Sequence, residues 1–156
     1  AIFTTDLGQK LLKKLGEMRP DLFLKQIFQS EAYFTKKQLA EHVAYALGSE
    51  QAKAFMFAFM NTMNPYAPRQ AGTENDMALY RQLQHLPVER IQCPSLIIHG
   101  THDADVKFYD GVYAYEHIPG AERFWIEEGG HLGFWLSPNG PAAQDAARDF
   151  LARQRP

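Results

Sequence analysis

The N-terminal part of the chain carries apolar side chains at helical spacing, interrupted by residues that start and stop helices. Between residues 7 and 18 a leucine or methionine recurs every three or four positions, until Pro20 ends the run. Thr35 and Gln38 have the spacing of a capping box, and the helix that they start should end at Gly48. The pattern therefore predicts one helix after another in this part of the chain.

The next predicted helix is apolar on almost every side. It runs through Ala52 to Met60, with Phe55 and Phe59 on one face and Met56 on the neighbouring face. Such a helix needs cover on two sides. It either lies centrally in the core or covers an apolar pocket with one of its faces.

A segment rich in proline and glycine, residues 64–72, interrupts the helical pattern and marks our predicted domain boundary. We expect residues 1–68 to form an all-helical unit and residues 69–156 to form a second unit. The second unit should begin with a helix capped by Thr73. The side chains expected on the inner face of that helix are Leu79, Leu83 and Leu86.

From about residue 90 the period of the pattern changes. Residues 95–99 form a short, continuous apolar run, as expected of a parallel strand that is covered on both faces. Residues 108–117 indicate a crossover helix, residues 123–126 a second strand, and residues 137–139 the start of a final helix. The inner stripe of that helix should consist of Ala143, Ala147, Phe150 and Leu151. The order strand, helix, strand, helix is a βαβα unit, which predicts the α/β class with a parallel sheet.

Composition and charge exclude several kinds of partner. The 156-residue chain is 46% hydrophobic and 22% charged, which suits a packed core with a solvated surface. Its net charge of −2 argues against nucleic acid and anionic membranes, since both select basic surfaces. We expect neither as a partner, and no apolar run is long enough to cross a bilayer.

Cysteine content and the first residues indicate the compartment. The single cysteine, Cys93, excludes an internal disulfide and a zinc site built on paired cysteines. The first residues lack the order of a signal peptide, so we expect a cytoplasmic protein. A glycine-rich phosphate loop is missing from the sequence, and we expect no cofactor.

Acidic residues and a histidine follow the two predicted strands. Asp103 and Asp105 lie in the loop after the first strand, and His131 lies among glycines in the loop after the second strand. Neighbouring parallel strands place their C-terminal loops side by side. A carboxylate there can fix the tautomer of the histidine and stabilise its protonated form, which is what a general base requires.

Residues 90–137 resemble the C-terminal part of the α/β-hydrolase fold. Residues 90–103 are similar to the strand and loop that lead to the acid of that family. Residues 120–131 are similar to its last strand and its catalytic histidine loop. The helices of residues 1–68 resemble the cap that such enzymes insert before this segment.

The resemblance implies specific roles for the loop residues. From the Gly-x-x-Asp spacing that starts at Gly100, it implies Asp103 as the acid, with Asp105 as the alternative. It implies His131 as the base. A small-molecule substrate would bind between these residues and the cap.

The sequence departs from the family at the nucleophile. Family members carry a Gly-x-Ser-x-Gly elbow and most of the oxyanion hole before the cap. None of the serines of this chain has glycines at the two flanking positions; they are Ser30, Ser49, Ser95 and Ser137. We therefore expect an incomplete fold whose N-terminal part is lost by processing or truncation, or is separately encoded.

Two parallel strands are too few for a stable, covered sheet, and they leave an edge open. We expect this edge to be covered in one of three ways. The missing N-terminal half, a second copy of the chain, or rearranged or swapped local elements would each serve.

A second interpretation of the loop residues is a metal site. Imidazole and carboxylate groups suit zinc or manganese, and the candidate ligands are His99, His102, Asp103, Asp105 and His131. Side chains alternate along an extended loop, which separates His99 from His102, so we expect no metal here. His99 should be a structural hydrogen-bonding residue, and His102 should lie on a cleft wall or in solvent.

The sequence thus predicts the cap and acid/base segment of a serine-type α/β-hydrolase acting on a small, largely apolar ester, amide or C–C bond substrate. Without nucleophile and oxyanion donors, the isolated chain should be inactive. The alternative is a non-catalytic binding or assembly module that reuses the fold, with Asp103 and His131 as relics.

Overall fold

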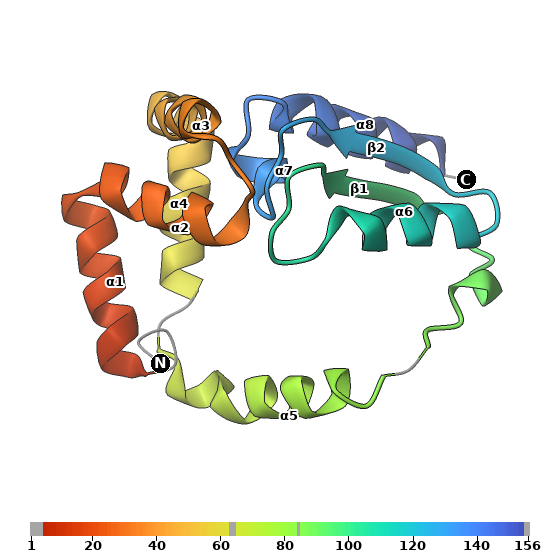
Figure 1. Ribbon diagram of the computed structural model, residues 1–156, viewed down its shortest axis with the longest axis horizontal. Coiled ribbons are helices and arrows are strands. Elements are labelled where there is room, and N and C mark those ends of the chain that lie inside the picture. Colours follow the sequence, from red (N-terminus) through yellow and green to blue (C-terminus); the bar gives the residue numbers. More distant parts are fainter. Residues whose placement is uncertain (1–4, 63–64, 84, 155–156) are drawn as a thin grey trace.

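A computed structural model describes residues 5–62, 65–83 and 85–154, in which helices precede and then alternate with two strands (Figure 1). The first helices are α1 (Asp6–Met18), α2 (Pro20–Glu31), α3 (Lys36–Gly48), α4 (Glu50–Thr62) and α5 (Gln70–Tyr80). The remaining elements are β1 (Leu96–Gly100), α6 (Phe108–His117), β2 (Glu122–Ile126), α7 (Gly133–Leu136) and α8 (Gly140–Arg153). Two short 3₁₀ turns, η2 (Ala67–Arg69) and η3 (Val88–Arg90), lie on either side of α5.

α1 ends before Pro20, and α3 runs from its capping box to Gly48, as the sequence predicts. The hydroxyl of Thr5 caps α1 by accepting a hydrogen bond from the amide of Gly8 at 3.1 Å. Pro20 begins α2, where a missing N–H leaves no hydrogen bond unmade. Thr35 and Gln38 form the predicted capping box at the start of α3, in which each side chain meets the main chain of the other.

The hydrophobic core lies within the helical part of the molecule. Its buried residues are Phe23, Leu24, Phe28, Ala46, Ala52, Met56, Met60 and Leu136. Met56 and Met60 place one face of α4 in this core, while Phe55 on the neighbouring face stacks on Trp135 with ring centroids 4.7 Å apart. Leu136 comes from α7, so the core joins the helical part to the segment that follows the second strand.

The parallel sheet forms as predicted. β1 and β2 lie in register from Leu96 opposite Glu122 to Gly100 opposite Ile126. α6 packs on β1 and α8 packs mainly on β2, on either side of the sheet in Figure 1. No third strand joins this sheet within the described ranges, so the α/β class and the incomplete sheet are both confirmed.

The prediction for the helix after the boundary was wrong in its start and in its burial. α5 begins at Gln70 instead of Thr73 and ends at Tyr80, and none of its residues is buried. The leucines expected on an inner face are all at least half exposed: Leu79, Leu83 and Leu86. α5 lies along the lower edge of Figure 1, apart from the sheet, so its apolar positions have no core to face.

The C-terminal helix differs from its prediction in two ways. A short additional helix, α7, precedes it and supplies Leu136 to the core. Leu151, expected on the inner stripe of α8, is 64% exposed, whereas Ala143 and Phe150 of the same stripe are buried. The stripe is therefore narrower than its spacing predicts, because only one side of α8 meets the sheet.

The predicted boundary between residues 68 and 69 falls inside η2 and remains a prediction. Of the proline- and glycine-rich segment, residue 64 lies outside the described residues, as does residue 63 before it.

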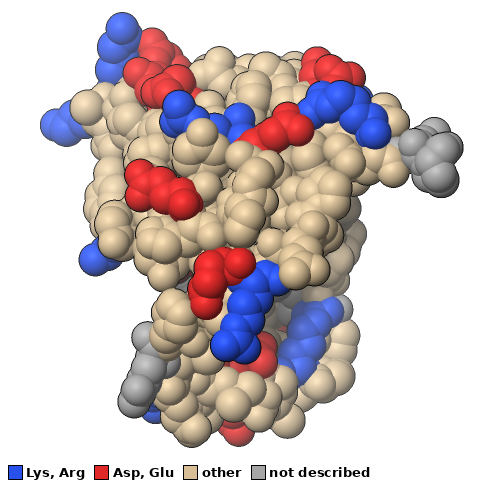
Figure 2. All heavy atoms as spheres, turned by 90° about the vertical axis from the view of Figure 1, so that its right-hand side faces the viewer, with Lys and Arg blue, Asp and Glu red and all other residues tan. Residues whose placement is uncertain are grey.

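Charges of both signs are interspersed on the face drawn in Figure 2, where Lys and Arg lie beside Asp and Glu. Among the ion pairs of the described residues, a guanidinium nitrogen of Arg153 lies 2.5 Å from a carboxylate oxygen of Glu122. None of the helices in the described part of the chain has the length and apolar character needed to span a membrane.

Candidate active site

The loops that follow β1 and β2 lie directly against each other. The amide of Thr101 donates to the carbonyl of Ile126 at 3.1 Å, and the amide of His102 donates to the carbonyl of Gly129 at 2.8 Å. Glu128 adopts a φ of 54°, which residues other than glycine rarely do, and the hydroxyl of Thr101 accepts a hydrogen bond from its amide. These contacts fix the histidine loop relative to the acidic loop.

Asp103 and His131 meet between these loops. Oδ2 of Asp103 lies 3.0 Å from Nδ1 of His131. An ionised carboxylate only accepts hydrogen bonds, so Nδ1 carries the proton, and in the neutral ring the lone pair is on Nε2. His131 is about one-third exposed, whereas Asp103 is buried, so the histidine ring alone can reach a substrate.

The other groups around Asp103 hold its carboxylate in place. Oδ1 accepts hydrogen bonds from the amides of Asp105 and Val106, each at 2.9 Å. Nε2 of His99 donates to the carbonyl of Val106 at 3.0 Å and lies 3.5 Å from Oδ2 of Asp103. His99 is therefore the structural hydrogen-bonding residue that the sequence predicts, and the buried carboxylate is well supplied with donors.

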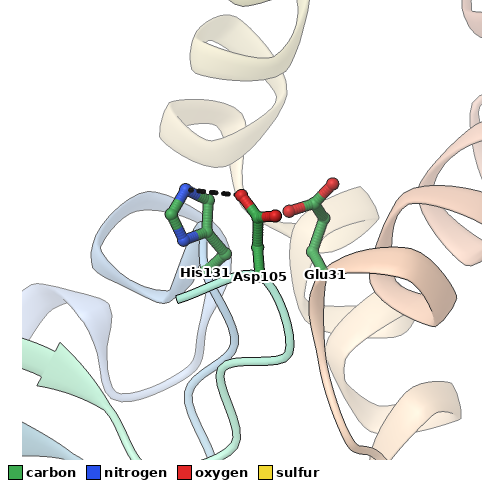
Figure 3. A group of neighbouring side chains, drawn as sticks. All are labelled: Glu31, Asp105 and His131. Atoms are coloured by element: carbon green, nitrogen blue, oxygen red, sulfur yellow. Dashed lines mark ion pairs between the residues drawn. The ribbon is translucent and has the colours of Figure 1, made fainter. Parts of the chain in front are cut away.

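Asp105 lies on the opposite side of the histidine ring from Asp103. One of its oxygens is 3.6 Å from Nε2 of His131, and its side chain is 62% exposed. In Figure 3 Asp105 stands between His131 and Glu31, a residue at the end of α2. Of the two aspartates, only Asp103 is placed to orient the histidine through Nδ1.

A largely apolar cavity of about 480 Å³ opens beside His131. Its walls come from three helices and include Leu12, Leu15, Phe23, Ile27, Phe59 and Met60. At one end these walls give way to Glu31, Asp105 and His131. The volume is in the range that accommodates small organic molecules. α4 thus serves both predicted purposes, since Met60 belongs to the core and also lines the cavity with Phe59.

Glu31 is an ionisable residue of this site that the sequence did not single out. Burial raises the pKa of its carboxyl above the ordinary value, and the negative charge of Asp105 raises it further. His131 and the hydroxyl of Ser30 act in the opposite direction. No periodicity or spacing links Glu31 to the loops, so only the folded structure reveals it.

The metal cluster considered from the sequence does not assemble. His102 does not line the cavity; its Nε2 lies 3.5 Å from the side-chain Nε2 of Gln38, and its Nδ1 lies 3.1 Å from the hydroxyl of Thr101. A different group, Glu31, Asp105 and His131, places one ligand atom each within 4.8 Å of the others. These three could hold a cation by donor type, with Nε2 as the ligand atom of His131.

The four serines all use their hydroxyls locally. Ser30 donates to the carbonyl of Ile27, Ser95 donates to the carbonyl of Cys93, and Ser49 and Ser137 accept from the amides of nearby residues. Cys93 lies before β1, at the end of the strand opposite to the site. Neither residue type offers His131 an evident nucleophile partner.

No protein-family model matches the chain. A stretch of 45 residues is 44% identical to "Alpha/beta hydrolase domain-containing protein aho-3" of Caenorhabditis elegans. This stretch covers 28% of the present chain and 14% of that protein. The solved structure of an "Alpha/beta hydrolase fold protein from Nakamurella multipartita" superposes with a TM-score of 0.88 at 28% sequence identity. The superposition covers 96% of this chain and 52% of the other, so the chain spans about half the length of that relative.

These likenesses agree with the fold. A helical part precedes two parallel strands whose loops bring an aspartate to a histidine, as the sequence resemblance implies. The chain therefore has an α/β-hydrolase fold, of which it represents a part.

Proposed function

We propose that this chain supplies the acid and the base of a serine-type α/β-hydrolase. The proposal depends most on one observation: Nδ1 of His131 is held at 3.0 Å by buried Asp103, while the ring borders an apolar cavity. His131 would be the general base and then the general acid, and Asp103 would orient it.

In the proposed reaction, Nε2 of His131 removes the proton of a serine hydroxyl as its oxygen attacks the substrate carbonyl. Asp103 stabilises the resulting imidazolium. The histidine then gives its proton to the leaving group, and a covalent acyl-enzyme remains. A water molecule repeats the sequence, restoring the serine and releasing the acid.

The cavity supports a small, largely apolar substrate. Most of the surface that lines it is apolar, from aliphatic, aromatic and thioether side chains. The polar lining carries charges of both signs, from Lys13 and from the carboxyl groups of Glu31 and Asp105. An apolar lining favours a compound without a net charge, so we propose a neutral ester, amide or activated C–C bond compound as the substrate.

The nucleophile and the oxyanion donors would come from the N-terminal half of the fold, as part of a longer chain or as a separate partner. The length of the solved relative supports this, since the present chain covers 52% of it. We propose that the isolated chain is inactive. We also propose a cytoplasmic location, as the low cysteine content favours.

The test replaces His131 in the protein that also contains the nucleophile-bearing half. His131→Ala should abolish ester turnover and leave the thermal transition in place, whereas His85→Ala, on an exposed histidine, should leave turnover intact. The isolated chain should form no acyl adduct with a nitrophenyl ester in a mass spectrum. Unchanged turnover of His131→Ala, or stoichiometric acylation of the isolated chain, would refute the proposal.

A second candidate function is an assembly module without catalysis. The apolar side chains exposed on α1 and α5 favour it, among them Leu7, Leu11, Met18, Met77 and Tyr80. A docked partner would remove such surface from water. In that case His131→Ala would leave every property of the assembled protein unchanged.

A further inference from the structure

Residues 31–33, which are the last residue of α2 and the first two of its connection to α3, run between the acidic loop and the histidine loop. Ala32 is extended, with φ −151° and ψ 147°, and it pairs with Asp103 in an isolated antiparallel bridge. The amide of Tyr33 donates to the carbonyl of His102 at 2.8 Å, and the amide of Ala104 donates to the carbonyl of Glu31 at 3.1 Å. These two hydrogen bonds enclose Asp103 on both sides.

The same segment also holds the histidine. The carbonyl of Glu31 accepts a second hydrogen bond, from the amide of His131, at 3.0 Å. One carbonyl oxygen of the helical part therefore joins both loops. Its two donors are the amide of His131 itself and the amide of Ala104, the residue after Asp103.

Ala32 makes close contact with the histidine loop as well. It is 7% exposed, and a Cβ placed on Gly130 would lie 2.6 Å from the Cβ of Ala32 and 3.1 Å from the carbonyl oxygen of Glu31. Only a glycine fits at position 130 while the segment stays where it is. Gly120 alone among the described glycines has a positive φ, so Gly130 is required for space and not for its backbone conformation.

We propose that residues 31–33 are positioning residues that set the distance and the tautomer of the Asp103–His131 pair. The inference rests on the proposed function, in which that pair is the acid and base. Catalytic geometry tolerates only small displacements, so main-chain bonds to both loops would have a direct effect on the hydrogen bond between the side chains. The helical part would then position the pair in addition to lining the cavity.

The side chain of Tyr33 has little part in this arrangement. It is 65% exposed, and the contribution of Tyr33 to the loops is its main-chain N–H. Substitutions can therefore separate the main chain from the side chain at this position.

The first experiment enlarges Gly130 and then relieves the contact. Gly130→Ala should push the segment away from the histidine loop, and Ala32→Gly in the same protein should restore its place. The readout is the ¹⁵N spectrum of the His131 ring, recorded on the chain itself and assigned with His131→Gln. We expect a protonated Nδ1 and an unprotonated Nε2 in the parent chain, loss of that pattern in Gly130→Ala, and its return in the double variant.

The second experiment removes one donor. Tyr33→Pro deletes the N–H that bonds to His102, and Ala32 already has the extended backbone that a following proline requires. Tyr33→Ala is the matched control, because it keeps the N–H. The proline variant should lose the Nδ1–H pattern of His131 and the alanine variant should keep it. This pair decides the question if Gly130→Ala fails to fold.

Different outcomes separate the two proposals. A parent chain without the Nδ1–H pattern would refute the acid–base pair itself and the proposed function with it. A parent chain with the pattern, unaltered by Gly130→Ala and by Tyr33→Pro, would refute the positioning role alone. A pattern lost in Gly130→Ala but not regained with Ala32→Gly would also refute it, since the effect would then not pass through Ala32.

Discussion

Gly100 at the end of β1 touches the main chain of Gly129 so closely that a Cβ on Gly100 would overlap the carbonyl oxygen of Gly129. The two glycines therefore determine how near the acidic loop and the histidine loop can lie. Neither loop can move away without losing the hydrogen bond between the amide of His102 and the same carbonyl, at 2.8 Å.

Gly100→Ala should consequently displace the histidine loop. Overpacking of this kind destabilises by about 1–3 kcal/mol, and we expect the upper end of that range because the neighbour is main chain. Urea unfolding would measure the change. Gly48→Ala is the control, since a Cβ there meets nothing within 4 Å, and it should not destabilise the chain. Equal stabilities for the two variants would contradict the argument.

Asp103→Asn should reverse the tautomer of His131. The amide oxygen can still accept from the main chain, but the amide nitrogen would then face Nδ1 of His131, which can no longer donate. In the assembled hydrolase we expect kcat to fall by on the order of 10³- to 10⁴-fold, measured by ester turnover.

Asp105→Asn is the comparison that identifies the acid. Asp105 is exposed and lies 3.6 Å from Nε2, on the other side of the ring, so its loss should reduce kcat far less. A larger effect at Asp105 than at Asp103 would assign the orienting role to Asp105.

The charge of Glu31 should make stability depend on pH. Burial and Asp105 raise the pKa of this carboxyl in the folded state, so the folded chain favours its protonated form. The stabilisation that folding gains from protonated Glu31 is complete below the pKa that this carboxyl has in the unfolded chain. It is lost as the pH rises through the higher pKa of the folded chain. Glu31→Gln, which is neutral at every pH, should therefore be more stable than the parent at pH 7 and equally stable in acid.

The expected difference at pH 7 is below about 1 kcal/mol, because solvent screens a partly exposed carboxyl. Thermal unfolding at a series of pH values would measure it. Glu116→Gln removes one charge from an exposed position on α6 and serves as control. A parent chain more stable than Glu31→Gln at pH 7 would show that Glu31 makes a favourable ionic contact instead.

Leu136 should contribute to the stability of the helical part even though it follows the second strand. It is 2% exposed and belongs to the same buried cluster as Leu24 and Met56. Leu136→Ala should cost about 2–5 kcal/mol in urea unfolding, as is usual for a buried leucine. Leu151→Ala, at a position 64% exposed, should cost little. A small loss at position 136 would mean that α7 is not part of the core.

The parts of the fold that could be predicted depend on local signals. Residues close together in the sequence determine three of these elements: the capping box of Thr35 and Gln38, the apolar run of β1 and the crossover helix. The meeting of Asp103 with His131 could also be predicted, because neighbouring parallel strands end at the same edge of the sheet.

The rest depends on contacts between distant segments. The bridge between Ala32 and Asp103 and the place of Glu31 at the cavity have no periodic signature. The burial of α5 was mispredicted for a related reason: leucines at helical spacing indicate that a helix needs an apolar neighbour, but not that this chain provides one.

The bridge between Ala32 and Asp103 has a consequence for the order in which the polypeptide matures during translation. The helices that surround Ala32 leave the ribosome before the acidic and histidine loops and can pack through contacts that are close in sequence, which form fast. His131, whose amide donates a hydrogen bond to the carbonyl of Glu31, is synthesised far later. A nascent chain paused before that point would lack the second hydrogen bond to this carbonyl and the Leu136 side chain of the core, so the acid–base pair is among the last features of the molecule to assemble.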